Sequence, residues 1–329
     1  MKILYIFAID SAVGRDSHAR STLQPELSHH YPPTPSIASE SRVTYDSART
    51  SAANRSAALS GTEKGTKIHF PLYLHLGPFS VHPHVFFEAL AYTIGFLAFR
   101  RLRGGTGDAV SDSTRWTVVA AAVAGAAIGS RVLYWFEDPA QTLAHWHDLV
   151  YLMDGKTIVG GLIGGIFAVE LAKRLIGEKR STGDLFAAPL ALGIAIGRIG
   201  CFLTGLADHT YGTPTSLPWG VDFGDGIPRH PTQLYESVFA LVLFTFLWRM
   251  TRRTHASGDA FKVFMVSYMS WRLVIDYLKP EARIAGLSGI QWACVAMLLY
   301  YGRDIRRWIL DRGTGVADMP ARSVDSAGN

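Results

Sequence analysis

The stretch DLFAAPLALGIAIGRIGCFLTG, residues 184–205, decides the fold class of this chain. After Asp184 it is almost wholly apolar, and it is long enough to cross the hydrocarbon core of a bilayer as an α-helix. One arginine, Arg198, lies inside it. A charge at the centre of a membrane helix costs about 2.5 to 3.5 kcal/mol, so Arg198 needs a partner, a wet cavity or a function. The stretch therefore predicts a transmembrane helix that contributes to a site.

Apolar stretches of similar length recur on both sides of this one. Together with 184–205, they predict an all-α, polytopic membrane protein with about seven transmembrane helices. The composition agrees, because 48% of the 329 residues are hydrophobic and only 18% are charged. The other stretches lie at roughly 84–100, 116–136, 157–175, 233–249, 260–278 and 289–303.

Lysines and arginines cluster after every second stretch, whereas the loops 137–156, 206–232 and 279–288 carry few of them. Because basic loops remain in the cytoplasm, this pattern predicts an outer N-terminus and a cytoplasmic C-terminus. The net charge of +5 thus reflects topology, and we expect no nucleic-acid partner. The clustered residues are Arg100, Arg101, Arg103, Lys173, Arg174, Lys179, Arg180, Arg249, Arg252, Arg253, Arg303, Arg306 and Arg307.

The two ends of the chain differ from the apolar part. Residues 1–66 are rich in Ser, Ala, Thr and Arg, and we expect a disordered N-terminal extension there. The short run ILYIFAI at 3–9 leaves a signal peptide as an alternative, and a misassigned start codon is another. We expect the membrane domain over 67–312 and a disordered cytoplasmic tail over 313–329.

Glycines repeat at the four-residue spacing that lets helix backbones approach closely, and helix packing is their simplest interpretation. The pairs are Gly160 with Gly164, Gly161 with Gly165, and Gly193 with Gly197. The chain has two cysteines, Cys201 and Cys294, far apart in apolar stretches, so neither a disulfide framework nor a zinc-site spacing is visible. We expect no metal and no organic cofactor.

Five charged residues stand out within the apolar stretches: Glu88, Arg131, Arg198, Arg272 and Asp276. The last two are four residues apart, so they share a helix face and can pair, with a tyrosine one turn earlier on that face. A structural ion pair is the alternative to a functional site. The fork of the Arg198 guanidinium suits a phosphodiester, and a buried arginine bonded to helix-end carbonyls is the alternative there.

The loop before the fifth stretch ends in PRHPTQLYES, residues 228–237. His230 lies at the expected start of the fifth helix, with Tyr235 and Glu236 about one turn inside it. A histidine here is either a helix-start residue or a base, and both interpretations remain open.

Three motifs occur in order across this loop: GRIGCFLTG at 197–205, PWGVDF at 218–223 and RHPTQLYE at 229–236. Their combination resembles the signature of the prolipoprotein diacylglyceryl transferases. The GGLIGG stretch at 160–165 and the face with Tyr268, Arg272 and Asp276 also fit this family. The resemblance covers roughly residues 75–305.

The resemblance implies transfer of the diacylglyceryl group of phosphatidylglycerol to the lipobox cysteine thiol of prolipoproteins, in a multi-pass protein of the bacterial inner membrane. It implies that two arginines hold the lipid phosphate and that Asp276 orients the second one. The predicted catalytic residues are Arg198, Arg272, Tyr268 and His230. The predicted substrate-binding residues are Gly160, Gly161, Arg198, Asp276 and Glu236.

The chain departs from the family pattern at the expected base. The family typically carries a histidine before the two glycines of GGLIG, where this chain has Val159. A substitute base is His209 or His230, or the reaction uses the small thiolate fraction present near neutral pH.

A second departure lies in the lipid-binding motif, where Cys201 replaces an asparagine. Leu206 stands where an acidic residue is expected, with Asp208 two positions later. These departures favour one alternative, a non-catalytic or altered-specificity lipid-binding paralogue. A small-solute transporter is a third possibility, disfavoured because no internal repeat is visible.

Overall fold

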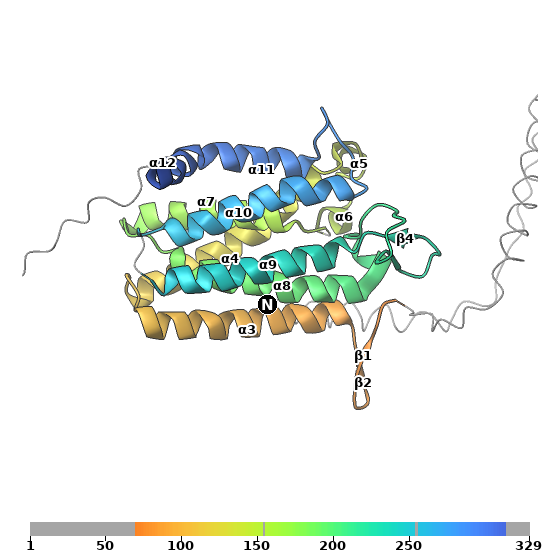
Figure 1. Cartoon of the computed structure of the whole chain (residues 1–329), viewed down its shortest axis with the longest axis horizontal. Helices are drawn as coiled ribbons and strands as arrows, with labels where there is room; N and C mark the ends of the chain where they lie inside the picture. The colour runs from red at the N-terminus through yellow and green to blue at the C-terminus, as the bar shows by residue number, and fades with distance from the viewer. Residues whose placement is uncertain (1–69, 154, 254–255, 314–329) are drawn as a thin grey trace, which may run out of the picture. The chain divides into compact units, whose positions relative to one another are not determined.

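The computed structural model describes residues 70–153, 155–253 and 256–313 of the chain (Figure 1). The predictions for 1–66 and for 314–329 lie outside the described residues. The described part is mostly helical, and helices occupy all seven predicted apolar stretches. These helices are α3 (Pro83–Thr106), α4 (Asp112–Trp135), α7 (Ile158–Ile176), α8 (Asp184–Thr204), α9 (Thr232–Thr251), α10 (Asp259–Ile275) and α11 (Gly289–Tyr300).

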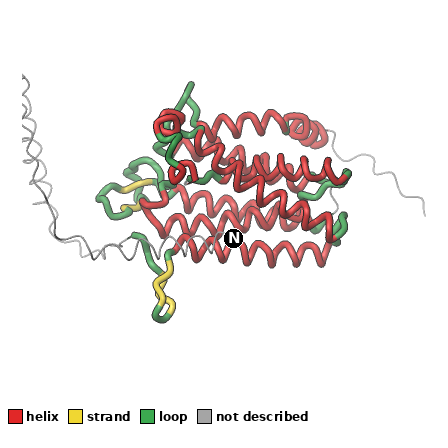
Figure 2. The backbone as a smooth tube through the Cα atoms, turned by 180° about the vertical axis from the view of Figure 1, so that it is seen from behind, coloured by secondary structure: helices red, strands yellow, loops and turns green. Residues whose placement is uncertain are grey.

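The seven helices run back and forth, so that their connections gather at two ends of the bundle (Figures 1 and 2). One end carries the connections after α4, α8 and α10, which contain α5 (Pro139–Ala144), α6 (Leu149–Met153) and the short 3-10 helices η1 (Gly205–Asp208) and η2 (Asp276–Leu278). The other end carries the connections after α3, α7 and α9, together with α12 (Gly302–Gly313). The basic clusters of the sequence fall at this second end.

Two small antiparallel hairpins accompany the helices. They pair β1 (Leu74–Leu76) with β2 (Phe79–Val81), and β3 (Val221–Asp222) with β4 (Pro228–Arg229). The first turns at Gly77, whose φ of +62° favours glycine. In the second, the Asp222 carboxylate accepts hydrogen bonds from the backbone N–H groups of Gly224 and Gly226, at 2.8 and 2.9 Å. Local turn chemistry outside the apolar stretches therefore produces the strands.

Three of the described helices are long and apolar enough to cross a membrane: α4, α8 continued through η1, and α9. The helix α11 is apolar but has only 12 residues. Several helices also expose large apolar side chains on their outer faces, such as Val123, Phe167 and Phe246, which are 66%, 71% and 53% exposed. Such faces suit lipid tails better than water. The seven-span count and the orientation stay predictions.

The helices α4 and α7 pack so closely that several of their glycines leave no room for a side chain. A Cβ atom added to Gly164 would lie 2.3 Å from the carbonyl oxygen of Gly125, and one added to Gly129 would lie 2.4 Å from that of Gly160. The predicted packing role of Gly160 and Gly164 is thus confirmed. At Gly197, by contrast, an added Cβ would meet no described atom within 4 Å.

The helix α8 is the central element, because α3 packs along one side of it and α9 along another. Its small side chains permit this, since Ala187, Ala188 and Ala191 are fully buried. The neighbouring α10 contributes large core side chains, including Phe264 and Met265, which are also fully buried. The ends of α8, α9 and α10 are thereby brought together.

Candidate active site

A cluster of buried charges lies where α8, α9 and α10 approach the end of the bundle that carries η1 and η2. Its members come from the end of α8, the first turns of α9, the last turn of α10 and the residues just after it. Each is at most 6% exposed. They are Arg198, Glu236, Arg272, Asp276 and Lys279.

The Glu236 carboxylate is the centre of this cluster. Its Oε2 lies 2.9 Å from Nη2 of Arg198 and 3.2 Å from Nη1 of Arg272, so one carboxylate bridges both arginines. The hydroxyl of Tyr268 donates a hydrogen bond of 2.5 Å to the other oxygen, Oε1. Glu236 is the fifth residue of α9, which begins at Thr232 directly after Pro231. The cluster therefore links three helices.

A second carboxylate continues the network. Nη2 of Arg272 lies 2.8 Å from Oδ1 of Asp276, which confirms the predicted pair. Nζ of Lys279 lies 3.4 Å from the same oxygen. The sequence interpretation missed Lys279, although its three-residue spacing from Asp276 is a signal for such a pair.

The cluster carries a formal excess of one positive charge, because three of its members are cations and two are carboxylates. Its donors are also incompletely used, since the buried Nε atoms of Arg198 and Arg272 have no hydrogen-bond partner among the described residues. Gln233, one turn before Glu236, is 1% exposed and its side-chain amide is likewise unpaired there. A buried group of this kind favours a monoanionic ligand that accepts hydrogen bonds.

Two further carboxylates outside the helices interact with this cluster. Burial raises the pKa of the Glu137 carboxyl to about 8, and the charge of Glu281 adds to this effect. The charges of Arg272 and Lys279 act in the opposite direction. Burial, followed by the charge of Asp276, likewise raises the pKa of Glu281. These carboxyls are therefore protonated more readily than ordinary surface glutamates.

Other predicted residues lie apart from the buried charges. Gly160 contacts α4, where an added Cβ would lie 2.4 Å from the carbonyl oxygen of Gly129, and Gly161 also neighbours α4. Nδ1 of His230 lies 3.4 Å from the hydroxyl of Tyr235, which accepts a hydrogen bond of 2.7 Å from Trp219. Roles for Gly160, Gly161 and His230 in the reaction stay predictions.

Two of the five charges singled out in the apolar stretches have local partners instead. Glu88 accepts a hydrogen bond of 3.0 Å from Tyr92, one turn away. Arg131 donates to the carbonyl oxygens of Ala127 and Met153, at 2.9 and 3.2 Å. Glu88 thus has a tyrosine partner on its own helix, and Arg131 has two carbonyl partners.

The position at which the family typically carries a histidine base is apolar in this chain. Val159 is 1% exposed and packs in the hydrophobic core. It offers no proton acceptor, and an imidazole there would have to be accommodated among apolar side chains.

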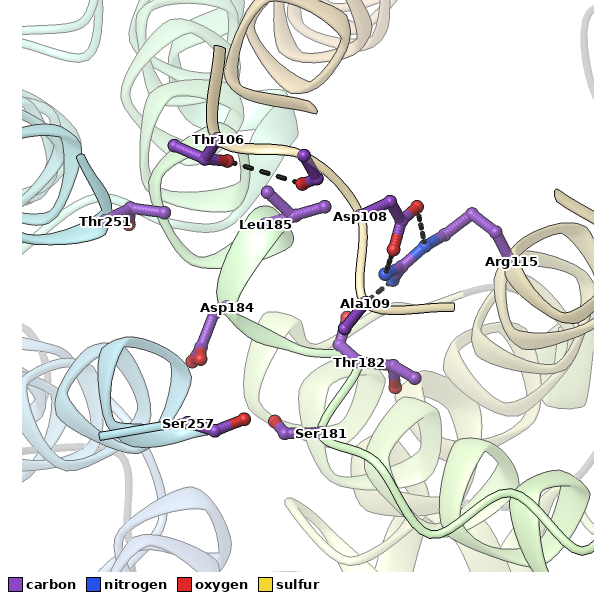
Figure 3. Close-up of a pocket in the computed structure, with 11 residues that line it drawn as sticks. Thr106, Asp108, Ala109, Arg115, Ser181, Thr182, Asp184, Leu185, Thr251 and Ser257 are labelled. Carbon is purple, nitrogen blue, oxygen red and sulfur yellow. Dashed lines mark hydrogen bonds and ion pairs between the residues drawn. The ribbon is translucent and has the colours of Figure 1, made fainter. Parts of the chain in front are cut away.

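A polar cavity of about 370 Å³ lies at the opposite end of the bundle (Figure 3). Arg115 there donates to Asp108 at 2.9 Å and to the carbonyl oxygen of Thr182 at 2.6 Å. Asp184 accepts from the backbone N–H groups of Gly258 and Phe261, at 2.6 and 3.1 Å. These bonds join the connections that follow α3, α7 and α9, so this network fastens the far end of the bundle.

The fold and the cluster define a helical membrane protein with a buried, cation-rich polar site. The family model for prolipoprotein diacylglyceryl transferase matches residues 71–302, and the chain belongs to this family. Its relatives include proteins named phosphatidylglycerol–prolipoprotein diacylglyceryl transferase. The one from Bordetella bronchiseptica is 32% identical over 250 residues, covering 70% of this chain and 91% of the relative. The one from Nitratidesulfovibrio vulgaris is 30% identical over 275 residues, covering 76% and 96%.

Proposed function

We propose that this chain transfers the diacylglyceryl group of phosphatidylglycerol to the cysteine thiol of lipobox segments in prolipoproteins. The observation that carries the proposal is the buried pair Arg198 and Arg272, which shares the Glu236 carboxylate and retains a net positive charge. The names of the relatives favour this activity over a non-catalytic lipid-binding paralogue.

The positive charges of Arg198 and Arg272 suit the bonds that form and break in this transfer. The thiol loses its proton to water, and the sulfur forms a bond to the terminal glyceryl carbon that carries the phosphate. The bond between that carbon and the phosphate oxygen breaks, and its electron pair leaves on the phosphate as glycerol phosphate. Charge therefore grows on the phosphate in the transition state, where Arg198 and Arg272 stabilise it by charge-assisted hydrogen bonds in a dry environment.

The remaining cluster residues position these arginines. Asp276 orients Arg272, and Tyr268 fixes Glu236 through the hydrogen bond of 2.5 Å. Because Glu236 bridges both arginines, it holds them in place before the lipid arrives, and the phosphate then joins or displaces it. His230, Gly160 and Gly161 complete the proposed site from the outer loop and from α7.

The proposed setting is the bacterial inner membrane, crossed by seven helices with the N-terminus outside and the C-terminus in the cytoplasm. Supporting this orientation, the basic residues gather at the end of the bundle that carries α12. The buried cluster lies toward the other end, where secreted prolipoproteins present their lipobox segments. The proposed membrane domain covers 67–312.

The experiment is a transfer assay with the purified full chain in vesicles that contain phosphatidylglycerol. A synthetic lipobox peptide should gain the mass of a diacylglyceryl group, and the same peptide with serine in place of its cysteine should not. Binding of phosphatidylglycerol without any mass gain would leave the lipid-binding paralogue as the better account.

A further inference from the structure

Three side chains with metal-binding atoms converge at the end of α8, beside Arg198. His84 lies in the first turn of α3, Cys201 in the last turn of α8, and Asp208 at the end of η1. Nδ1 of His84 lies 3.0 Å from Oδ1 of Asp208 and 4.0 Å from Sγ of Cys201. The candidate ligand atoms all lie within 4.8 Å of one another. One nitrogen, one sulfur and one oxygen therefore share a small volume.

These separations match those around a tetrahedral zinc ion. Zinc bonds of about 2.0 to 2.1 Å to nitrogen and oxygen, and about 2.3 Å to sulfur, place neighbouring ligand atoms about 3.3 to 3.6 Å apart. The separations from Nδ1 of His84, 3.0 and 4.0 Å, bracket this range. The third separation is at most 4.8 Å, so the three atoms enclose a slightly larger volume than one zinc ion occupies and would close in on it when it binds.

The charge and burial of the three side chains also favour a cation. Cys201 and the Asp208 side chain are each only 9% exposed, and the His84 side chain is 36% exposed. A thiolate and a carboxylate carry two negative charges, which one divalent ion neutralises. Arg198 donates a hydrogen bond of 3.9 Å from Nη1 to Sγ of Cys201, which stabilises the thiolate that a metal ion requires, while its Nη2 pairs with Glu236.

The carboxylate also has the outer support that metal ligands commonly have. The Thr210 hydroxyl donates a hydrogen bond of 2.5 Å to Oδ2 of Asp208, which leaves Oδ1 toward His84. Such bonds orient ligating carboxylates and strengthen metal binding. A metal site was not predictable from the sequence, because His84 and Cys201 are 117 positions apart and no short ligand spacing is present.

We propose that His84, Cys201 and Asp208 bind a thiophilic divalent cation, with Zn²⁺ as the ion whose ligand preferences fit. Three protein ligands leave one tetrahedral position for an external ligand. If the proposed transferase function holds, a prolipoprotein thiol that enters this position binds as its thiolate and releases its proton to water. The ion would thereby promote loss of the thiol proton in place of the histidine base, whose position is occupied by Val159.

The binding test uses the full chain, purified in detergent without a histidine tag, stripped with a chelator and reloaded with Zn²⁺ or Co²⁺. We expect about one zinc per chain, and a thiolate-to-cobalt charge-transfer band after Co²⁺ loading. The variants Cys201→Ser and Asp208→Asn should lose the band. The matched control Cys294→Ala changes the other cysteine, which is fully buried in α11, and should retain it.

Three results would overturn the metal site: no zinc above background in the wild type, a band that survives Cys201→Ser, or a band lost in Cys294→Ala. If Cys201→Ser fails to accumulate, Thr210→Val provides a milder test, because loss of the supporting bond should weaken Co²⁺ binding about tenfold or more. Unchanged Co²⁺ affinity in Thr210→Val would then count against the site.

The role in transfer is tested separately. Chelation should abolish transfer to the lipobox peptide and added Zn²⁺ should restore it. Transfer that continues in metal-free protein would overturn the role while leaving the binding result intact. A protein that binds zinc in a Cys201-dependent way but never transfers lipid would instead overturn the proposed function alone.

Discussion

Nη2 of Arg198, on α8, lies 2.9 Å from Oε2 of Glu236, on α9, and both side chains are buried. The carboxylate offsets the free-energy cost of removing the guanidinium from water. The arginine can therefore remain charged inside an apolar helix. It also fixes the direction of the guanidinium fork before any lipid is present. The relationship therefore explains how an apolar helix retains a charged guanidinium.

We expect Gly164→Ala to destabilise the protein by about 1 to 3 kcal/mol, because its Cβ would lie 2.3 Å from the Gly125 carbonyl oxygen. Thermal unfolding in detergent measures this. The matched control is Gly165→Ala, whose Cβ would lie 3.5 Å from the nearest atom, the carbonyl oxygen of Ala122, and should change stability by less than about 0.5 kcal/mol. Equal melting temperatures for the two variants would show that the close packing of α4 and α7 is wrong.

We expect Asp276→Asn to cost about 3 to 5 kcal/mol and to lower transfer activity, because it leaves two buried cations, Arg272 and Lys279, without their shared carboxylate. Chemical denaturation gives the stability change. Asp304→Asn is the control, since its pair with Lys262 is partly exposed and should contribute at most about 1 kcal/mol. A loss no larger than that of the control would mean that the buried network does not hold the site together.

The pH dependence of stability should report on Glu137. Its pKa in the folded protein, about 8, lies above its ordinary value of 4.5, so its contribution is full below pH 4.5 and is lost as the pH rises through 8. The variant Glu137→Gln should therefore melt higher than the wild type at about pH 9, with a smaller difference at about pH 5. Glu170→Gln alters an exposed glutamate on α7 and serves as the control. A Glu137→Gln profile parallel to that of the wild type would contradict the prediction.

Sequence periodicity predicted the long helices well, because a transmembrane stretch of apolar residues has few alternatives to a helix. The pair of Arg272 with Asp276 was predictable for a similar reason, since four-residue spacing fixes a shared helix face. The bridge from Glu236 to both arginines was not predictable, because it depends on how far α9 descends beside α8 and α10. The approach of His84 to Cys201 was not predictable for the same reason, because only helix packing brings α3 to the end of α8.

The topology can be tested with reporters. A reporter fused after Arg312 should be cytoplasmic, and one inserted near Gly224 should be on the outer side, because the basic clusters gather at the end of the bundle opposite the β3–β4 hairpin. Accessibility to a membrane-impermeant thiol reagent, at cysteines introduced in the two places, provides an independent measurement. Opposite labelling of either place would contradict the seven-span arrangement.

In the proposed function Arg198 holds the lipid phosphate, and this role is measured by the rate at which Arg198→Lys transfers a diacylglyceryl group to a lipobox peptide. Lysine keeps the charge but cannot reproduce the bidentate fork, so we expect the rate to fall by about 100-fold or more while the protein remains in the membrane. Arg115→Lys changes an arginine that is equally buried but lies at the far end of the bundle, and should keep nearly the full rate. Equal rates for Arg198→Lys and Arg115→Lys would show that the Arg198 guanidinium does not hold the lipid phosphate.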